Sequence, residues 1–347
     1  MFRILKLDNL LANSTDMTFT GKICDEHKEQ YDNFMSKYKI ILLLENSMSK
    51  DLPLKSRSER ICRFCKKKQP EVTFRMDAHI APELIGNKNL LSDSECDSCN
   101  AKFSKYEDSL ANYLGIIRSV NRTKTKEGVP KFKTPDNKFI ITEGYLDAQD
   151  TEKKIVFESH DRENNHFEYD EAAKQIKMRI TKHSYNPYKV FKSILKIGLS
   201  LVKDEEVANY QRAFEILQTD EHDDENPKAY TIVEHLCPGP AFPSPLYLLF
   251  EKKATDEAIP THIFVMYFEN FIYQIALPYN NKDRWMYDGI IEIGHHILPP
   301  LMDEPWVRKF GKPKQYIVDM SKNEKIKNAS QEIIFELDKP IFQDSES

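Results

Sequence analysis

Two pairs of closely spaced cysteines constrain this chain more than any other feature. The pairs are Cys62 with Cys65 and Cys96 with Cys99. In each pair a tight turn directs two thiolates toward one point, and four thiolates complete a tetrahedral site for a structural zinc ion. The loop of about thirty residues between the pairs is longer than a minimal zinc ribbon needs. We therefore expect a small zinc-bound module whose loop carries further residues.

The loop and its flanks contain polar residues in a specific order. His79 is followed three residues later by Pro82, Asn89 directly precedes Leu90, and Asn100 directly follows the last cysteine. Together with the cysteine pairs, this order resembles the HNH endonucleases, the His-Asn-His branch of the ββα-metal nucleases. The resemblance covers less than a sixth of the chain.

The resemblance implies a role for each of these three polar residues. In that family the first His is the general base on the attacking water, the middle Asn holds the loop in shape, and the last His or Asn binds the catalytic metal. These roles fall on His79, Asn89 and Asn100. Taken by themselves, His79 could be a structural histidine, and Asn100 could be the N-cap of a helix.

One position departs from the family pattern. Many members have an acidic metal ligand directly before the first His, and this chain has Ala78 there. Asp77, Glu83 and Glu107 are the carboxylates that could replace it, and the sequence does not choose among them.

Phosphodiester hydrolysis needs the two kinds of group that this segment offers. A base must activate water, and a neutral histidine near its ordinary pKa can do so at cellular pH. A divalent cation must offset charge on the phosphate, and Mg²⁺ or Mn²⁺ takes oxygen ligands while keeping several waters. A zinc ion with four sulfur ligands has no open position, so we expect it to be structural.

Charge is distributed unevenly along the chain. The net charge is -5 in total, yet residues 55–133 alone carry about +7. A basic segment that coincides with the cysteine-framed module indicates contact with phosphates. The predicted nucleic-acid contacts are Lys102, Lys105, Arg122, Lys124, Lys126 and Lys131.

Length and pattern predict an α+β protein with a zinc-stapled ββα module and a larger mixed region containing antiparallel sheet. The expected divisions are an N-terminal segment and linker over 1–58, the nuclease module over 59–133, and a C-terminal α+β domain over 134–347. Within the module we expect a strand at 71–75 and a helix from Asn100 to about Val120.

Alternating and periodic patterns predict the elements outside the module. Strands are expected at 39–44, although this short apolar run also fits a buried helix, and at 138–146, 153–160, 166–169 and 174–181, the last four as one antiparallel meander. Helices are expected at 25–38, at 205–217, and from Asn186-Pro187 to Val202. Further strands are expected at 229–236, 246–252, 263–268, 272–277, 290–293 and 315–319. The neighbouring His295 and His296 are expected to be structural.

Composition favours a cytoplasmic protein without a membrane anchor. The mean hydropathy is -0.60, and no run of apolar residues is long enough for a bilayer span. Six cysteines, four of them in zinc-like pairs, suit a reducing compartment better than a disulfide framework.

The leading hypothesis is a metal-dependent HNH endonuclease that cuts double-stranded DNA. Its C-terminal domain would select substrate, form a homodimer or bind a regulatory protein. Proteins of this layout resemble bacterial mobile-element, restriction or antiviral-defence nucleases. Two alternatives are a non-catalytic zinc module that binds nucleic acid or protein, and an RNA-cleaving toxin nuclease.

Overall fold

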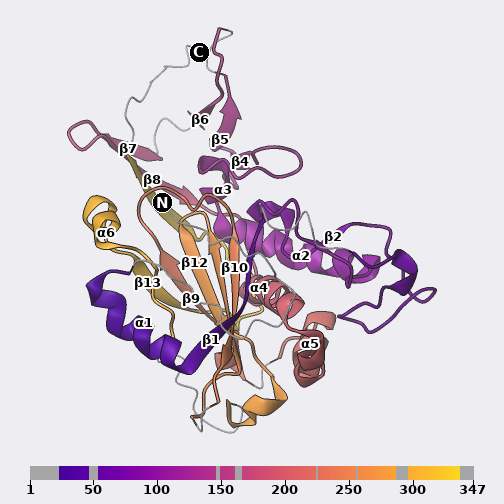
Figure 1. Cartoon of the computed structure of the whole chain (residues 1–347). Helices are drawn as coiled ribbons and strands as arrows, with labels where there is room; N and C mark the ends of the chain where they lie inside the picture. Colours follow the sequence, from indigo (N-terminus) through magenta and orange to yellow (C-terminus); the bar gives the residue numbers. More distant parts are fainter. Residues whose placement is uncertain are drawn as a thin grey trace.

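The computed structural model confirms the α+β class (Figure 1). It describes residues 23–46, 54–145, 149–160, 166–223, 226–254, 257–286 and 296–336. The expected strand at 290–293 and His295 lie outside these residues. None of the helices in the described ranges is long and apolar enough to span a bilayer.

A six-stranded antiparallel sheet forms the centre of the molecule. Its strand order is β1-β10-β11-β12-β9-β13. The strands are β1 (Tyr38–Glu45), β9 (Thr231–Leu236), β10 (Leu246–Lys252), β11 (His262–Phe268), β12 (Phe271–Ala276) and β13 (Lys314–Asp319). Because β1 pairs with β10, the N-terminal segment contributes a strand to the same sheet as the last third of the chain. The apolar run at 39–44 is thus a strand and not a helix.

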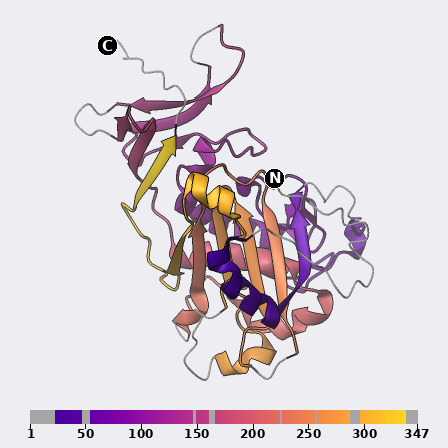
Figure 2. The same ribbon diagram turned by 60° about the vertical axis from the view of Figure 1, so that its left-hand side comes forward.

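Both faces of this sheet are covered, which explains why its strands are apolar without clean alternation. Along β11, Phe264 and Met266 face one core while Ile263 and Val265 face the other. Helix α1 (Asp25–Lys37) and helix α6 (Glu304–Phe310) cover the second face, in front of the sheet in Figure 2. Helix α4 (Pro187–Leu201) covers the first.

Helix α4 connects the sheet to the cysteine-framed module. It begins as predicted, with Pro187 in the first turn and the Asn186 side chain accepting a hydrogen bond from the Lys189 N–H. One side of α4 lies against β11 and β12 so closely that a Cβ on Gly198 would be 2.6 Å from Leu277. Its other side packs on the module's helix, and one apolar core contains residues of both.

The module has short strands and one long helix. Strands β2 (Ala78–His79) and β3 (Leu91–Ser92) pair antiparallel, and helix α2 (Asp97–Leu114) follows. The helix begins three residues before the predicted Asn100. It ends at Gly115, whose φ of +62° favours glycine, and α3 (Ile117–Val120) continues separately.

The strand predicted at 71–75 is wrong, and the reason is local. The Asp97 carboxylate at the start of α2 accepts hydrogen bonds from the Arg75 N–H at 3.0 Å, the Met76 N–H at 2.9 Å and the Thr73 hydroxyl. These donors bind a side chain at a helix N-terminus, so no partner strand is needed.

Two small sheets lie beyond the module, at the top of Figure 1. The predicted single meander is wrong, because β6 and β7 do not pair and belong to different sheets. One sheet holds β4 (Phe132–Lys133), β5 (Phe139–Gly144) and β6 (Lys154–Ser159). The other holds β7 (Phe167–Asp170), β8 (Gln175–Thr181) and β14 (Ser330–Glu336). Strand β14, which the sequence analysis missed, pairs along the whole of β8.

The remaining elements are short helices. The predicted helix at 205–217 is a 3₁₀ segment, η4 (Asp204–Tyr210), followed by α5 (Gln211–Gln218). The others are η2 (Arg57–Glu59), η3 (Glu83–Ile85), η5 (Pro227–Tyr230) and η6 (Asn281–Met286).

Candidate functional site

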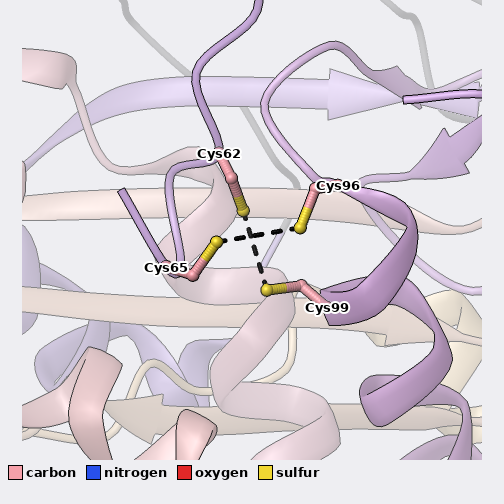
Figure 3. A group of neighbouring side chains, drawn as sticks. All are labelled: Cys62, Cys65, Cys96 and Cys99. Atoms are coloured by element: carbon pink, nitrogen blue, oxygen red, sulfur yellow. Dashed lines mark hydrogen bonds between the residues drawn. The ribbon is translucent and has the colours of Figure 1, made fainter. Parts of the chain in front are cut away.

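The four cysteines predicted to bind zinc converge at one point (Figure 3). Their sulfur atoms all lie within 4.8 Å of one another, and two pairs, Cys62 with Cys99 and Cys65 with Cys96, are 3.7 Å apart. A zinc–sulfur bond of about 2.3 Å gives a tetrahedron with edges of about 3.8 Å. The sulfur positions therefore fit a zinc ion, and four sulfurs leave it no open coordination position.

Local backbone geometry places these sulfurs. Cys62 begins a tight turn in which its carbonyl accepts from the Lys66 N–H, and Lys66 has a φ of +62°. Cys96 is the N-cap residue of α2, so the second pair occupies the first turn of that helix. Outside the segment, Gln218 of α5 donates its amide to the Cys99 sulfur at 3.3 Å.

His79 ends strand β2 and is half-buried. Its Nε2 lies 3.5 Å from Oε1 of Glu83, which is one turn further along in η3. Burial lowers the pKa of His79 below 6.5; the Glu83 carboxylate opposes this shift, and the charge of Lys196 adds to it. The lowered pKa keeps the imidazole neutral at cellular pH, which is the state a general base needs.

Lys196, from α4, holds the backbone that carries His79. Its ammonium donates to the His79 carbonyl at 2.5 Å and to the Ile80 carbonyl at 3.3 Å, and it lies 2.8 Å from Oε2 of Glu95. The side chains of Lys196 and Glu95 are 2 % and 0 % exposed. Burial raises the pKa of Glu95, and the charge of Lys196 opposes that shift. The sequence analysis assigned Lys196 no role.

The loop between β2 and β3 is held by Asn87, which the sequence analysis also missed. The fully buried Asn87 amide donates to the carbonyls of Ala81 and Leu90 at 2.5 and 3.2 Å, and its oxygen accepts from the N–H groups of Asn89 and Leu90. The Asn89 side chain instead donates to the Asn46 carbonyl at 3.1 Å. The only sequence signal for the role of Asn87 was that a second asparagine stands two residues before Asn89.

The Asn46 side chain joins the end of β1 to the same loop. Its amide donates to the Gly86 carbonyl at 3.0 Å, and its oxygen accepts from the N–H groups of Lys88 and Asn89. The central sheet is thereby fixed directly to the loop that follows His79.

The predicted ligands of the catalytic metal are not gathered as tightly as the cysteines. Asn100 is in the first turn of α2, and Glu107 lies seven residues on, so both are on one helix face. Burial raises the pKa of Glu107; Lys196 opposes the shift and Glu83 adds to it. Asp77 is exposed, 3.9 Å from Arg57. Among the His, Cys, Asp and Glu side chains of the described residues, only the four cysteines form a group of three or more that could hold a metal ion.

The predicted nucleic-acid contacts divide into free and engaged side chains. In the described part of the chain, no hydrogen bond or ion pair engages the exposed side chains of Lys105, Lys124, Lys126 and Lys131. Arg122 lies 3.0 Å from Glu143, and Lys102 donates to the Gln218 carbonyl. The charge of Lys126 reaches His79, whose pKa it lowers.

Comparison with known proteins identifies the same segment. Residues 62–112 match the sequence profile of an HNH endonuclease family. No curated protein and no solved structure matches the chain. The match ends within α2, so it covers the zinc site, the His79 loop and the first four turns of that helix. It does not extend to the central sheet or to the two small sheets.

Proposed function

We propose that this chain, whose residues 62–112 match the HNH endonuclease family, is a metal-dependent endonuclease that hydrolyses double-stranded DNA. An HNH domain indicates nuclease activity and binding to nucleic acid. The finer assignment gives His79 the role of general base and Asn100 that of an oxygen ligand to Mg²⁺ or Mn²⁺, with Asn89 supporting the loop. Zinc at the four cysteines stabilises the module.

The observation that carries the proposal is the environment of His79. It stands at the end of the β2–β3 hairpin, half-buried, with its pKa lowered and its backbone fixed by Lys196. The exposed lysines at 124 and 126 lie in the same module, after α3, and supply positive charge for a phosphate backbone.

Each residue has a defined task in hydrolysis. The neutral His79 imidazole accepts a proton from the attacking water, and Glu83 at 3.5 Å stabilises the imidazolium that forms. The divalent metal supplies positive charge at the phosphate and the leaving oxygen. The charges of Lys196 and Glu83 both reach Glu107, and Glu83 lies beside His79, so Glu83 or Glu107 is the expected substitute for the carboxylate missing at Ala78. The third carboxylate, Asp77, is exposed to solvent.

The test is cleavage of plasmid DNA by the full chain with Mg²⁺ or Mn²⁺. His79→Ala should cut about 10²–10⁴-fold more slowly while keeping zinc and DNA affinity, because only proton abstraction is lost. His160→Ala, which changes an exposed histidine, is the matched control. Asn100→Ala should recover at raised metal concentration, whereas His79→Ala should not. Cutting by His79→Ala at the wild-type rate would reject the mechanism.

One observation favours a second candidate, a non-catalytic zinc module. Ala78 stands at the usual acidic place, and the carboxylates of the described residues do not converge as a metal site. A wild-type protein that binds duplex DNA but cuts no substrate with either metal would favour it. Single-stranded RNA in the same assay tests the toxin-like alternative. A role in antiviral defence or restriction, and homodimer or regulatory contacts of the C-terminal region, follow only by analogy.

A further inference from the structure

A basic cavity lies where the module's helix ends. It has a volume of about 240 Å³ and is formed by the last turn of α2, by α3, by the residues around β4 and by His183. This is slightly below the range of about 300–1,000 Å³ typical of drug-sized ligand pockets, so it suits a smaller group. The cavity lies beyond Asn100 by more than ten residues of α2, or roughly 15 Å or more at about 1.5 Å per residue.

The lining of this cavity is positively charged. Arg118, Lys131 and Lys133 line it together with the imidazole of His183, and none of the lining residues is acidic. Phe132 packs edge-on against His183, with ring centroids 5.9 Å apart. Three cations line the cavity without a carboxylate among them, so an anion placed in it would meet only positive charge.

Arg118 is the most informative of these residues. It is half-buried, and burial alone lowers the pKa of its guanidinium, with no acidic neighbour raising it. Within the described residues the only hydrogen bond of its side chain runs from Nε to the Leu84 carbonyl at 2.8 Å, and no carboxylate pairs with the guanidinium. A partly desolvated guanidinium without a counter-ion is costly, and its remaining N–H groups form the fork that binds phosphate oxygens.

Two lysines at β4 complete the arrangement, Lys131 just before the strand and Lys133 within it. Lys131 and Lys133 alternate with the buried Phe132, so both project to the same side of the strand. Both side chains are exposed, and neither has a hydrogen bond or ion pair elsewhere in the described part of the chain. They are therefore available to a ligand at the mouth of the cavity.

We propose that this cavity is a phosphate-binding site, separate from the His79 centre, for the phosphate group of a nucleotide or of a nucleic-acid strand. Arg118 is the half-buried anchor, and Lys131 and Lys133 hold the same group at the entrance. Because Arg118 also donates to Leu84 of η3, directly after Glu83, an occupied cavity fixes the loop that carries the His79 partner. Only the nucleic-acid source of the phosphate rests on the proposed nuclease function.

Binding to the full chain without Mg²⁺ or Mn²⁺ tests this site. The calorimetric probes are 5′-deoxyadenosine monophosphate, inorganic phosphate and deoxyadenosine, and a 20-base-pair duplex is followed by fluorescence anisotropy. The main variant is Lys131→Gln with Lys133→Gln, whose side chains are exposed, so the fold is retained. The control is Lys325→Gln with Lys327→Gln, an equal charge change at two exposed lysines outside the cavity and outside the predicted nucleic-acid contacts. Arg118→Gln, checked for thermal stability, tests the anchor.

A free nucleotide as ligand predicts that the monophosphate binds and deoxyadenosine does not, and that the main variant loses roughly tenfold in affinity while the control does not. A strand phosphate as ligand predicts weak binding of the monophosphate. The main variant would then bind duplex more weakly than the control, with a salt slope reduced by about two. Equal behaviour of the main variant and the control with every probe would overturn the proposal. A wild-type protein that binds phosphate at this site but cleaves no DNA when Mg²⁺ or Mn²⁺ is added would reject the nuclease function alone.

Discussion

The zinc site and the His79 centre lie in one short segment but depend on the rest of the chain to different degrees. All four zinc ligands lie between Cys62 and Cys99, and their sulfurs are already within 4.8 Å. The candidate catalytic loop is held by residues from three other elements. These are Asn46 after β1, Lys196 of α4 and Arg118 of α3.

This difference shows that the cysteine site is specified by local sequence, whereas the His79 loop is specified by long-range contacts. A Cys-x-x-Cys turn is specified by residues three apart, so it forms wherever the metal is present. The His79 loop has its buried carbonyls satisfied by side chains far away in sequence, such as Lys196 at a separation of 117 residues. Activity should therefore depend on the C-terminal region even where zinc binding does not.

Zinc removal should have the largest effect on the molecule. Folded protein should contain about one zinc per chain, and Cys96→Ser or chelation should unfold the module, because structural zinc contributes roughly 10–16 kcal/mol in small zinc domains. The control is Cys237→Ser, a buried cysteine in the core on the other face of the central sheet. Metal analysis and circular dichroism measure both. Folded wild-type protein without zinc would contradict this assignment.

Breaking the Lys196–Glu95 pair should have the next largest effect. Lys196→Met leaves Glu95 buried without its partner and should lower the free energy of unfolding by about 3–5 kcal/mol, with loss of cleavage. Removing the charge as well, in Lys196→Met with Glu95→Leu, should recover much of the stability but not the cleavage. Urea unfolding and plasmid cleavage are the two measurements.

Lys192 provides the matched control for that experiment. It is equally buried on α4, but its ammonium donates to the Thr219 carbonyl and lies over the Tyr188 ring instead of pairing with a carboxylate. Lys192→Met should therefore leave cleavage unchanged. Equal loss of cleavage in both variants would mean that α4 acts through its general packing and not through the His79 backbone.

The family resemblance gives the loop-holding role to Asn89, but the hydrogen bonds predict a larger effect of substitution at Asn87. Asn87→Ala leaves the buried carbonyls of Ala81 and Leu90 without donors, at a cost of about 1–3 kcal/mol for each group left unsatisfied, and should slow cleavage. Asn89→Ala removes one bond to Asn46 and should have a smaller effect on both. Cleavage rates and thermal unfolding of the two variants decide between them. A larger effect of Asn89→Ala would return the loop-holding role to that residue.

The sequence predicted what short-range patterns encode. The cysteine spacing, the Asn186-Pro187 start of α4 and the successive strands β11 and β12 all depend on residues within a few positions of each other. The roles of Lys196, Asn87 and Arg118 depend on contacts made only after folding, and their residue types did not distinguish them from surface polar residues. The 71–75 segment was mispredicted for the same reason, since Asp97 binds the Thr73 hydroxyl and the Arg75 N–H.

The smallest predicted effect concerns pH and the far end of the module. Glu269, in the turn between β11 and β12, accepts from the Thr123 hydroxyl just after α3, and burial raises its pKa from 4.5 to about 7. Between these values the unfolded chain ionises Glu269 while the folded chain keeps the proton, so this residue makes the protein less stable as pH rises.

Glu269→Gln keeps a hydrogen-bond acceptor for Thr123 and removes that penalty. The variant should match wild type near pH 4.5 and be about 1–2 kcal/mol more stable above pH 7, a value reduced for the partial exposure of the side chain. Urea unfolding at pH 5 and pH 8 measures the difference. The contrary result is a free energy of unfolding that, relative to wild type, is lower at pH 8 than at pH 5. The ionised carboxylate would then be holding Thr123, and the connection between α3 and the central sheet would depend on charge.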